Sequence, residues 1–120
     1  MKLSDIVSCL EARDLVVSGE EALEKDFKYA FATDLMSDAL AMIKESPEDT
    51  LLISGLANVQ TLRTAEMLDI NTIVFVRGKM LNDEILEMGQ EGGLNLFTTR
   101  CTMYQACGRL YAKGLREINE

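Results

Sequence analysis

The sequence predicts an α/β fold, a three-layer α/β/α sandwich with a mixed, mostly parallel sheet of about five strands. From Thr50 onward, one pattern occurs three times: a short run favourable to a strand, a turn, and an amphipathic helix of about three turns. Such alternation indicates right-handed crossovers, which make neighbouring strands parallel. The 120 residues, 48% hydrophobic and 27% charged, fit one compact domain spanning 1–120.

The segment before these repeats predicts one helix and two strands. Apolar residues recur at helical spacing over 3–10, with Ser4 or Asp5 as the expected cap. Strands are expected at 15–17 and 27–33. About nine residues separate them, too few for a crossover helix, so we expect an antiparallel or loop-linked pairing. This pairing is what makes the predicted sheet mixed.

A second helix is expected over 35–43, where apolar residues form one stripe. Thr33 and Asp34 precede it as N-cap types, and Pro47 prevents its continuation.

The three repeats begin at Leu51, Thr72 and Leu94. Asn58 is the expected cap of the first repeat's helix, and Asn82 that of the second.

The ends of the last two helices are marked by glycine. Gly92-Gly93 supplies a left-handed stop, and the final helix is expected to end near Gly114. Residues after Leu115 are expected to fray.

Charge and composition limit the partners and the compartment. Asp and Glu outnumber Lys and Arg by 20 to 12, and the net charge of −8 repels nucleic acid and anionic lipid, so neither is an expected partner. The N-terminus lacks the apolar segment of a signal peptide, and no stretch is long enough to span a bilayer. We therefore expect a cytoplasmic protein with reduced thiols.

The residue types argue against an enzyme. Histidine is absent, which removes His-activated nucleophiles and the commonest zinc ligand. Neither G-x-G-x-x-G nor G-x-x-x-x-G-K-[ST] occurs. Asp34 and Asp38 lie one helical turn apart, as ordinary surface acids do, and leave carboxylate catalysis as a minor alternative. We expect no catalytic residue, metal or cofactor.

The carboxyl ends of the predicted parallel strands form the candidate ligand site, because helix N-termini there favour anions. Three of the four turns at this edge combine hydroxyls, glycine or cations in a way that suits a small anionic ligand. The candidate ligand-binding residues are Asp34, Ser54, Gly55, Asn58, Arg77, Gly78, Thr98 and Thr99. The alternative is that these residues only cap helices and form tight turns.

The three cysteines differ in expected role. Cys107 falls on the apolar stripe of the last helix, which favours packing. Cys101 is expected in that helix's first turn beside Arg100, where a reactive thiol is the alternative to a structural one. Six residues of helix separate the two, so they cannot form a disulfide or share a metal.

Residues 34–115 resemble the DRTGG domain, a module related to the N-terminal domain of bacterial HPr kinase/phosphorylase. The matching segments are 33–41, 51–55, 73–78 and 107–111, in the family's order. The resemblance is to small stand-alone members and implies a regulatory or accessory module that is not itself catalytic. Relatives are found fused to phosphotransacetylase and to pyrophosphatases with CBS domains.

The chain departs from the family at both turns that give the family its name. The Gly-Asp-Arg turn is replaced by Gly55-Leu56-Ala57, and the Thr-Gly-Gly turn by Arg77-Gly78-Lys79, so only Gly55 and Gly78 match. A ligand contact made by the family's acid or arginine in the first turn cannot be carried over.

Three functions remain open: a ligand-sensing module, a dimeric scaffold or interaction protein without a ligand, and an accessory protein of an iron–sulfur or hydrogenase system. A partner protein is consistent with each of them. We also expect a homodimer, because the chain has seven methionines and a small core cannot hold them all. The methionines concerned are Met36, Met42, Met80, Met88 and Met103.

Overall fold

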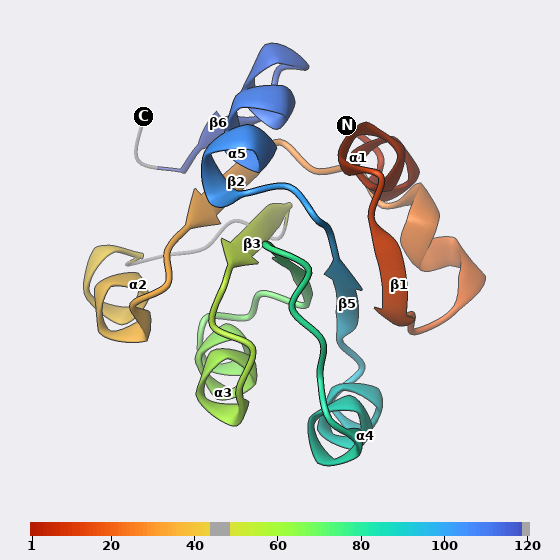
Figure 1. Cartoon of the computed structure of the whole chain (residues 1–120), viewed down its shortest axis with the longest axis vertical. Helices are drawn as coiled ribbons and strands as arrows, with labels where there is room; N and C mark the ends of the chain where they lie inside the picture. Colours follow the sequence, from red (N-terminus) through yellow and green to blue (C-terminus); the bar gives the residue numbers. More distant parts are fainter. Residues whose placement is uncertain (44–48, 119–120) are drawn as a thin grey trace.

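The computed structural model describes residues 1–43 and 49–118, which form a six-stranded sheet with helices on both faces (Figure 1). The elements are α1 (Leu3–Leu10), β1 (Arg13–Val16), the 3₁₀ helix η1 (Glu20–Glu24), β2 (Tyr29–Ala32), α2 (Met36–Met42), β3 (Thr50–Ser54), α3 (Val59–Met67), β4 (Thr72–Phe75), α4 (Asp83–Glu91), β5 (Asn95–Thr98), α5 (Met103–Ala112) and β6 (Arg116–Glu117). Pro47, expected to end the second helix, lies outside the described residues.

The predicted three-layer α/β/α sandwich is confirmed. Helices α2, α3 and α4 lie on one face of the sheet, and α1 and α5 lie on the other (Figure 1). Side chains alternate between the two faces: Leu52 and Ile73 belong to the core under α2–α4, whereas Leu51 and Val74 belong to the core under α1 and α5. All residues of β3, β4 and β5 are buried, as expected for strands covered on both faces.

The strand order is β1-β5-β4-β3-β2-β6. Strands β2, β3, β4 and β5 are parallel to one another, and β6 is parallel to β2. Among the strands of the described residues, only β1 is antiparallel, and it pairs with β5. The sheet is therefore mixed and mostly parallel, as predicted.

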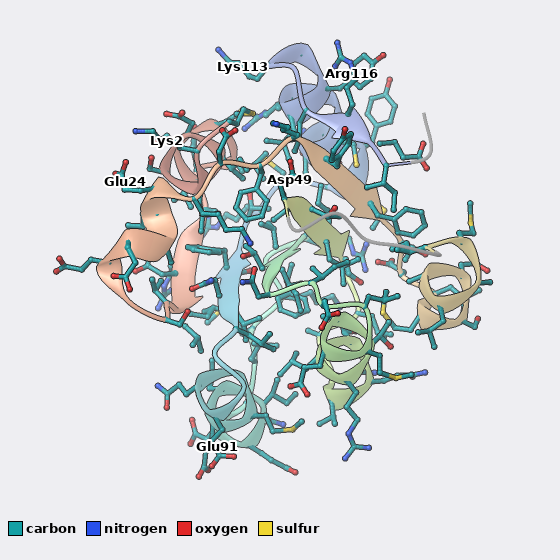
Figure 2. The ribbon with its side chains drawn as sticks, turned by 180° about the vertical axis from the view of Figure 1, so that it is seen from behind. Lys2, Glu24, Asp49, Glu91, Lys113 and Arg116 are labelled. Carbon is teal, nitrogen blue, oxygen red and sulfur yellow. The ribbon has the colours of Figure 1, made fainter. Side chains whose placement is uncertain are left out.

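The partner expected for the first strand was wrong. Strands β1 and β2 do not pair; β3, β4 and β5 separate them. The linker between them follows the N-terminus instead, because the Leu3 N–H donates to Lys25 O at 2.9 Å and the Phe27 N–H to Met1 O at 2.6 Å. Phe27 is fully buried and holds the linker beside the N-terminus. A pair formed by Lys2 and Glu24, whose Nζ and Oε2 atoms are 2.9 Å apart, lies beside it (Figure 2).

The expected fraying after Leu115 is also wrong, because Arg116 and Glu117 pair with β2 as β6. Leu115 is buried and its N–H donates to Leu110 O, which ties the segment to α5. The Arg116 N–H then donates to Lys28 O at 3.1 Å.

Two of the predicted helix caps are confirmed. Asn58 accepts from the Thr61 N–H at 3.2 Å at the start of α3, and Asn82 accepts from the Ile85 N–H at 3.0 Å at the start of α4. Gly93 adopts the left-handed conformation expected after α4, with φ 68°.

The other two predicted caps are wrong. The N-cap residues of α1 and α2 are Lys2 and Leu35, and neither makes a side-chain cap hydrogen bond. Thr33 Oγ1 instead accepts from the Leu35 N–H at 3.0 Å, which lies before the first residue of α2. No helix within 1–43 or 49–118 has the length and apolar character needed to cross a membrane.

Candidate ligand site at the carboxyl ends of the strands

Four turns meet at the carboxyl edge of the parallel strands, after β2, β3, β4 and β5. The helices that follow β4 and β5 pack on opposite faces of the sheet, so the chain diverges between these two strands (Figure 1). Such a divergence is where ligands bind in open α/β sheets. Here two hydrogen bonds join the turn after β4 to the loop after β5, from the Arg77 N–H to Cys101 O at 2.8 Å and from the Gly78 N–H to Thr99 O at 2.7 Å.

Three of the predicted site residues, from three different turns, are brought into direct contact. Asp34 Oδ1 accepts from the Gly55 N–H at 2.5 Å, and Asp34 Oδ2 lies 3.3 Å from Arg77 Nη1. The Arg77 guanidinium lies across Gly55, where a Cβ atom would overlap it. Asp34 therefore does not cap α2, and its carboxylate joins the turns after β3 and β4.

The turn after β4 has an unusual backbone. Arg77 and Gly78 both have left-handed conformations, with φ of 61° and 66°, and the Lys79 N–H closes the turn on Val76 O at 3.4 Å. For a residue with a Cβ, this conformation costs on the order of 1 kcal/mol. The conformation aims the Arg77 side chain along the edge of the sheet toward Asp34.

The Arg77–Asp34 pair is open to solvent. The two side chains are 43% and 48% exposed, so the pair contributes little to stability. An anion arriving from solvent can reach the guanidinium and compete with the carboxylate for it. Lys79 and Arg100 are also exposed at this edge, and the Arg100 Cγ lies about van der Waals distance, 4.0 Å, from a Cβ built on Gly78.

The other five predicted site residues have structural partners, and one of them, Gly78, donates its N–H to Thr99 O. Ser54 Oγ accepts from the Leu56 N–H at 3.1 Å, and Asn58 caps α3. The Thr98 hydroxyl donates to Lys79 O at 2.5 Å, and the Thr99 hydroxyl donates to Leu10 O at 2.6 Å. Ligand contacts by these five residues stay a prediction, since the four side chains and the Gly78 N–H already satisfy neighbouring backbone groups.

The sequence interpretation left Lys79 and Arg100 out of the candidate residues. Their signal was positional: each is in the turn that directly follows one of the parallel strands, as Arg77 is. The contact between Asp34 and Arg77 had no such signal, because 43 positions separate the two residues.

The cysteines are all free thiols. Cys101 precedes α5 rather than lying in its first turn, because Thr102 is the N-cap. Its Sγ is buried and donates weakly to Leu10 O at 3.8 Å. Burial raises the pKa of the Cys107 thiol. The described part of the chain has no group of three Cys, Asp or Glu side chains placed to hold a metal ion.

No protein-family model matches the sequence, and no curated protein matches it either. Among solved structures, the chain is similar to the CBS and DRTGG domains of the regulatory region of Clostridium perfringens pyrophosphatase, complexed with its activator, diadenosine tetraphosphate. The match has a TM-score of 0.70 and 17% identity, and it covers 95% of this chain and 47% of that chain. This chain thus spans about half the length of that protein's solved region. At this identity the likeness shows the fold, which is DRTGG-like.

Proposed function

We propose that the chain is a non-catalytic regulatory module that senses a small anionic ligand at the carboxyl ends of β3, β4 and β5. The observation that carries the proposal is the arrangement of Arg77, whose strained turn lays a solvent-accessible guanidinium across Gly55 and onto Asp34. The similarity to a pyrophosphatase regulatory region supports a regulatory role. A relation to the N-terminal domain of HPr kinase/phosphorylase and a cytoplasmic location belong to the same proposal.

Binding of an anion would change contacts between elements. An anion that takes Arg77 from Asp34 leaves the Asp34 carboxylate with the Gly55 N–H as its partner. Asp34 lies two residues before Met36, the first residue of α2, so the loss of its contact with Arg77 would change the chain just before α2. This change would then affect the molecule that α2 contacts, either a second copy of the chain or a partner protein.

The test is a titration of the full chain with a panel of anionic metabolites, followed by calorimetry and by amide chemical shifts. For a ligand that binds, Arg77→Gln should weaken affinity about ten-fold or more, because a charge-assisted hydrogen bond is lost. Arg63→Gln is the matched control. Arg63 is exposed on α3, so this substitution removes the same charge at a different place on the surface.

Two results would contradict the proposal. One is a ligand whose chemical-shift changes are confined to the opposite edge of the sheet. The other is equal loss of affinity in Arg77→Gln and Arg63→Gln, which would show a response to net charge alone.

A scaffold that acts by self-association is the second candidate, and exposed apolar residues on α2 favour it. Leu40 and Met42 are 43% and 48% exposed, and Leu35 at the N-cap is 57% exposed. Of the methionines expected at an interface, Met42 and Met80 are exposed, Met88 and Met103 are partly buried, and Met36 is buried in the core. An iron–sulfur or hydrogenase accessory role gains no support from the described cysteines.

A further inference from the structure

A cavity of about 210 Å³ lies between the end of α1 and the start of α5. It is lined by Leu10 and Glu11 at the end of α1, by residues 99–101, and by Gln105 and Arg109 on α5. At about 30 Å³ per water molecule, it has room for a phosphate group and a few further atoms.

The walls of the cavity are held in place by hydrogen bonds. Leu10 O accepts from both Thr99 Oγ1 and Cys101 Sγ, which fixes the loop after β5 against the end of α1. Glu11 closes α1 in the left-handed conformation, with φ 50°. Arg109 Nη1 donates to Cys9 O at 3.5 Å, which places the guanidinium at the cavity. The cavity is therefore formed before any ligand binds.

The charge at this cavity differs from that of the chain as a whole. Arg100 and Arg109 both line it and are both exposed, and no ion pair to either is found among residues 1–43 and 49–118. This is notable in a chain with a net charge of −8, where acidic partners are abundant. Glu11 is the one acidic residue in the lining.

We propose that this cavity binds the phosphate group of a small phosphate monoester through Arg100 and Arg109. Two guanidinium groups match the charge of a phosphate dianion and present several N–H donors to its oxygens. The side-chain oxygen of Gln105 accepts from the Thr102 N–H at 2.9 Å, which leaves the Gln105 amide N–H₂ as a further donor. A carboxylate carries one charge and would use only part of this set.

This inference rests on the proposed function in taking a small anion as the ligand, but it assigns the phosphate to different residues. The two places are connected, because Thr99 O and Cys101 O accept the Gly78 and Arg77 N–H groups. A phosphate held by Arg100 would thus act on the same loop that supports the Arg77 turn.

The experiment is calorimetric titration of the full chain with inorganic phosphate, and with sulfate and acetate at matched ionic strength. We expect phosphate to bind more tightly than acetate. The double variant Arg100→Gln/Arg109→Gln should weaken phosphate binding about ten-fold or more. Glu11→Gln should strengthen it, because a like charge is removed from the lining.

Controls separate this inference from the proposed function. Arg63→Gln should leave phosphate affinity unchanged, and thermal unfolding should show that each variant is folded; Arg100→Gln alone serves if loss of Arg109 disturbs α1. Phosphate binding that falls in Arg77→Gln but not in the double variant would overturn this inference and uphold the proposed function. Absence of phosphate binding would overturn the inference alone, since other anions of the panel still test Arg77.

Discussion

At the scale of single residues, the lack of a side chain at Gly55 determines whether Arg77 can reach Asp34. The guanidinium occupies the space that a side chain at position 55 would take. An aspartate from the turn after β2 and an arginine from the turn after β4 meet at this glycine. The match of Gly55 to a turn of the DRTGG domain stays a prediction from the sequence.

Gly55→Ala should therefore uncouple Arg77 from Asp34 while the fold persists. The guanidinium is the flexible end of an exposed side chain and can swing away, so the free energy of unfolding should fall by less than about 1 kcal/mol. A double-mutant cycle of Asp34→Asn and Arg77→Gln, measured by urea unfolding, should give a coupling of about 0.2–1 kcal/mol in the parent chain and none in Gly55→Ala.

Gly108→Ala is the matched control for this cycle, since a Cβ atom there has no heavy atom within 4 Å. The coupling should be retained in that background. A coupling that is unchanged in Gly55→Ala would show that Arg77 reaches Asp34 without crossing position 55.

The helices and central strands could be predicted from sequence because their signals are local. Asn58 and Asn82 cap helices through hydrogen bonds that reach only three residues ahead. The capping box of α5, formed by Thr102 and Gln105, has the same range, although it was not predicted.

Strand partners could not be predicted in the same way. The pairing of β1 with β5 joins residues 80 to 85 positions apart, and β6 is only two residues long. Neither feature has a local pattern, because each depends on which edge of the sheet is left open after the central strands have paired.

Packing between α4 and the sheet gives a prediction at the scale of an element. Gly89 is buried on α4, and a Cβ atom there would lie 2.6 Å from Leu96 Cδ1 and 3.6 Å from Val16 Cγ2. Leu96 is itself fully buried and has little freedom to move. Gly89→Ala should therefore lower the free energy of unfolding by about 1–3 kcal/mol in urea, because the helix must shift from the sheet.

Gly108→Ala in α5 tests the same substitution without the packing conflict. It should raise the free energy of unfolding by about 0.5–1 kcal/mol, since alanine favours a helix and nothing lies in its way. Equal effects of the two substitutions would mean that α4 packs less closely on β5 than the contact with Leu96 indicates.

At the scale of the whole molecule, the strand topology determines the location of the candidate site more than any single residue does. Parallel strands place the turns after them at one edge, so the edge could be predicted once the repeats were recognised. The polar groups that stay available to a ligand could not be predicted, because the hydroxyls of Thr98 and Thr99 donate to Lys79 O and Leu10 O in distant segments. Arg109 was missed for a similar reason: it reaches the edge only because α5 packs beside α1.

Self-association is the prediction that belongs to the molecule as a whole. Helix α2 lies near β2 (Figure 1), and its exposed apolar residues would be removed from water by a second copy related by two-fold symmetry. We expect sedimentation equilibrium at micromolar concentration to give twice the mass of one chain.

Leu40→Glu should shift the mass toward one subunit, because it places a charge in the apolar contact. Met67→Glu on α3 is the control, since it adds the same charge at an exposed methionine of another helix, 71% exposed, and should leave the dimer intact. A mass of one subunit over the whole concentration range would exclude self-association and leave α2 as a surface for a partner protein.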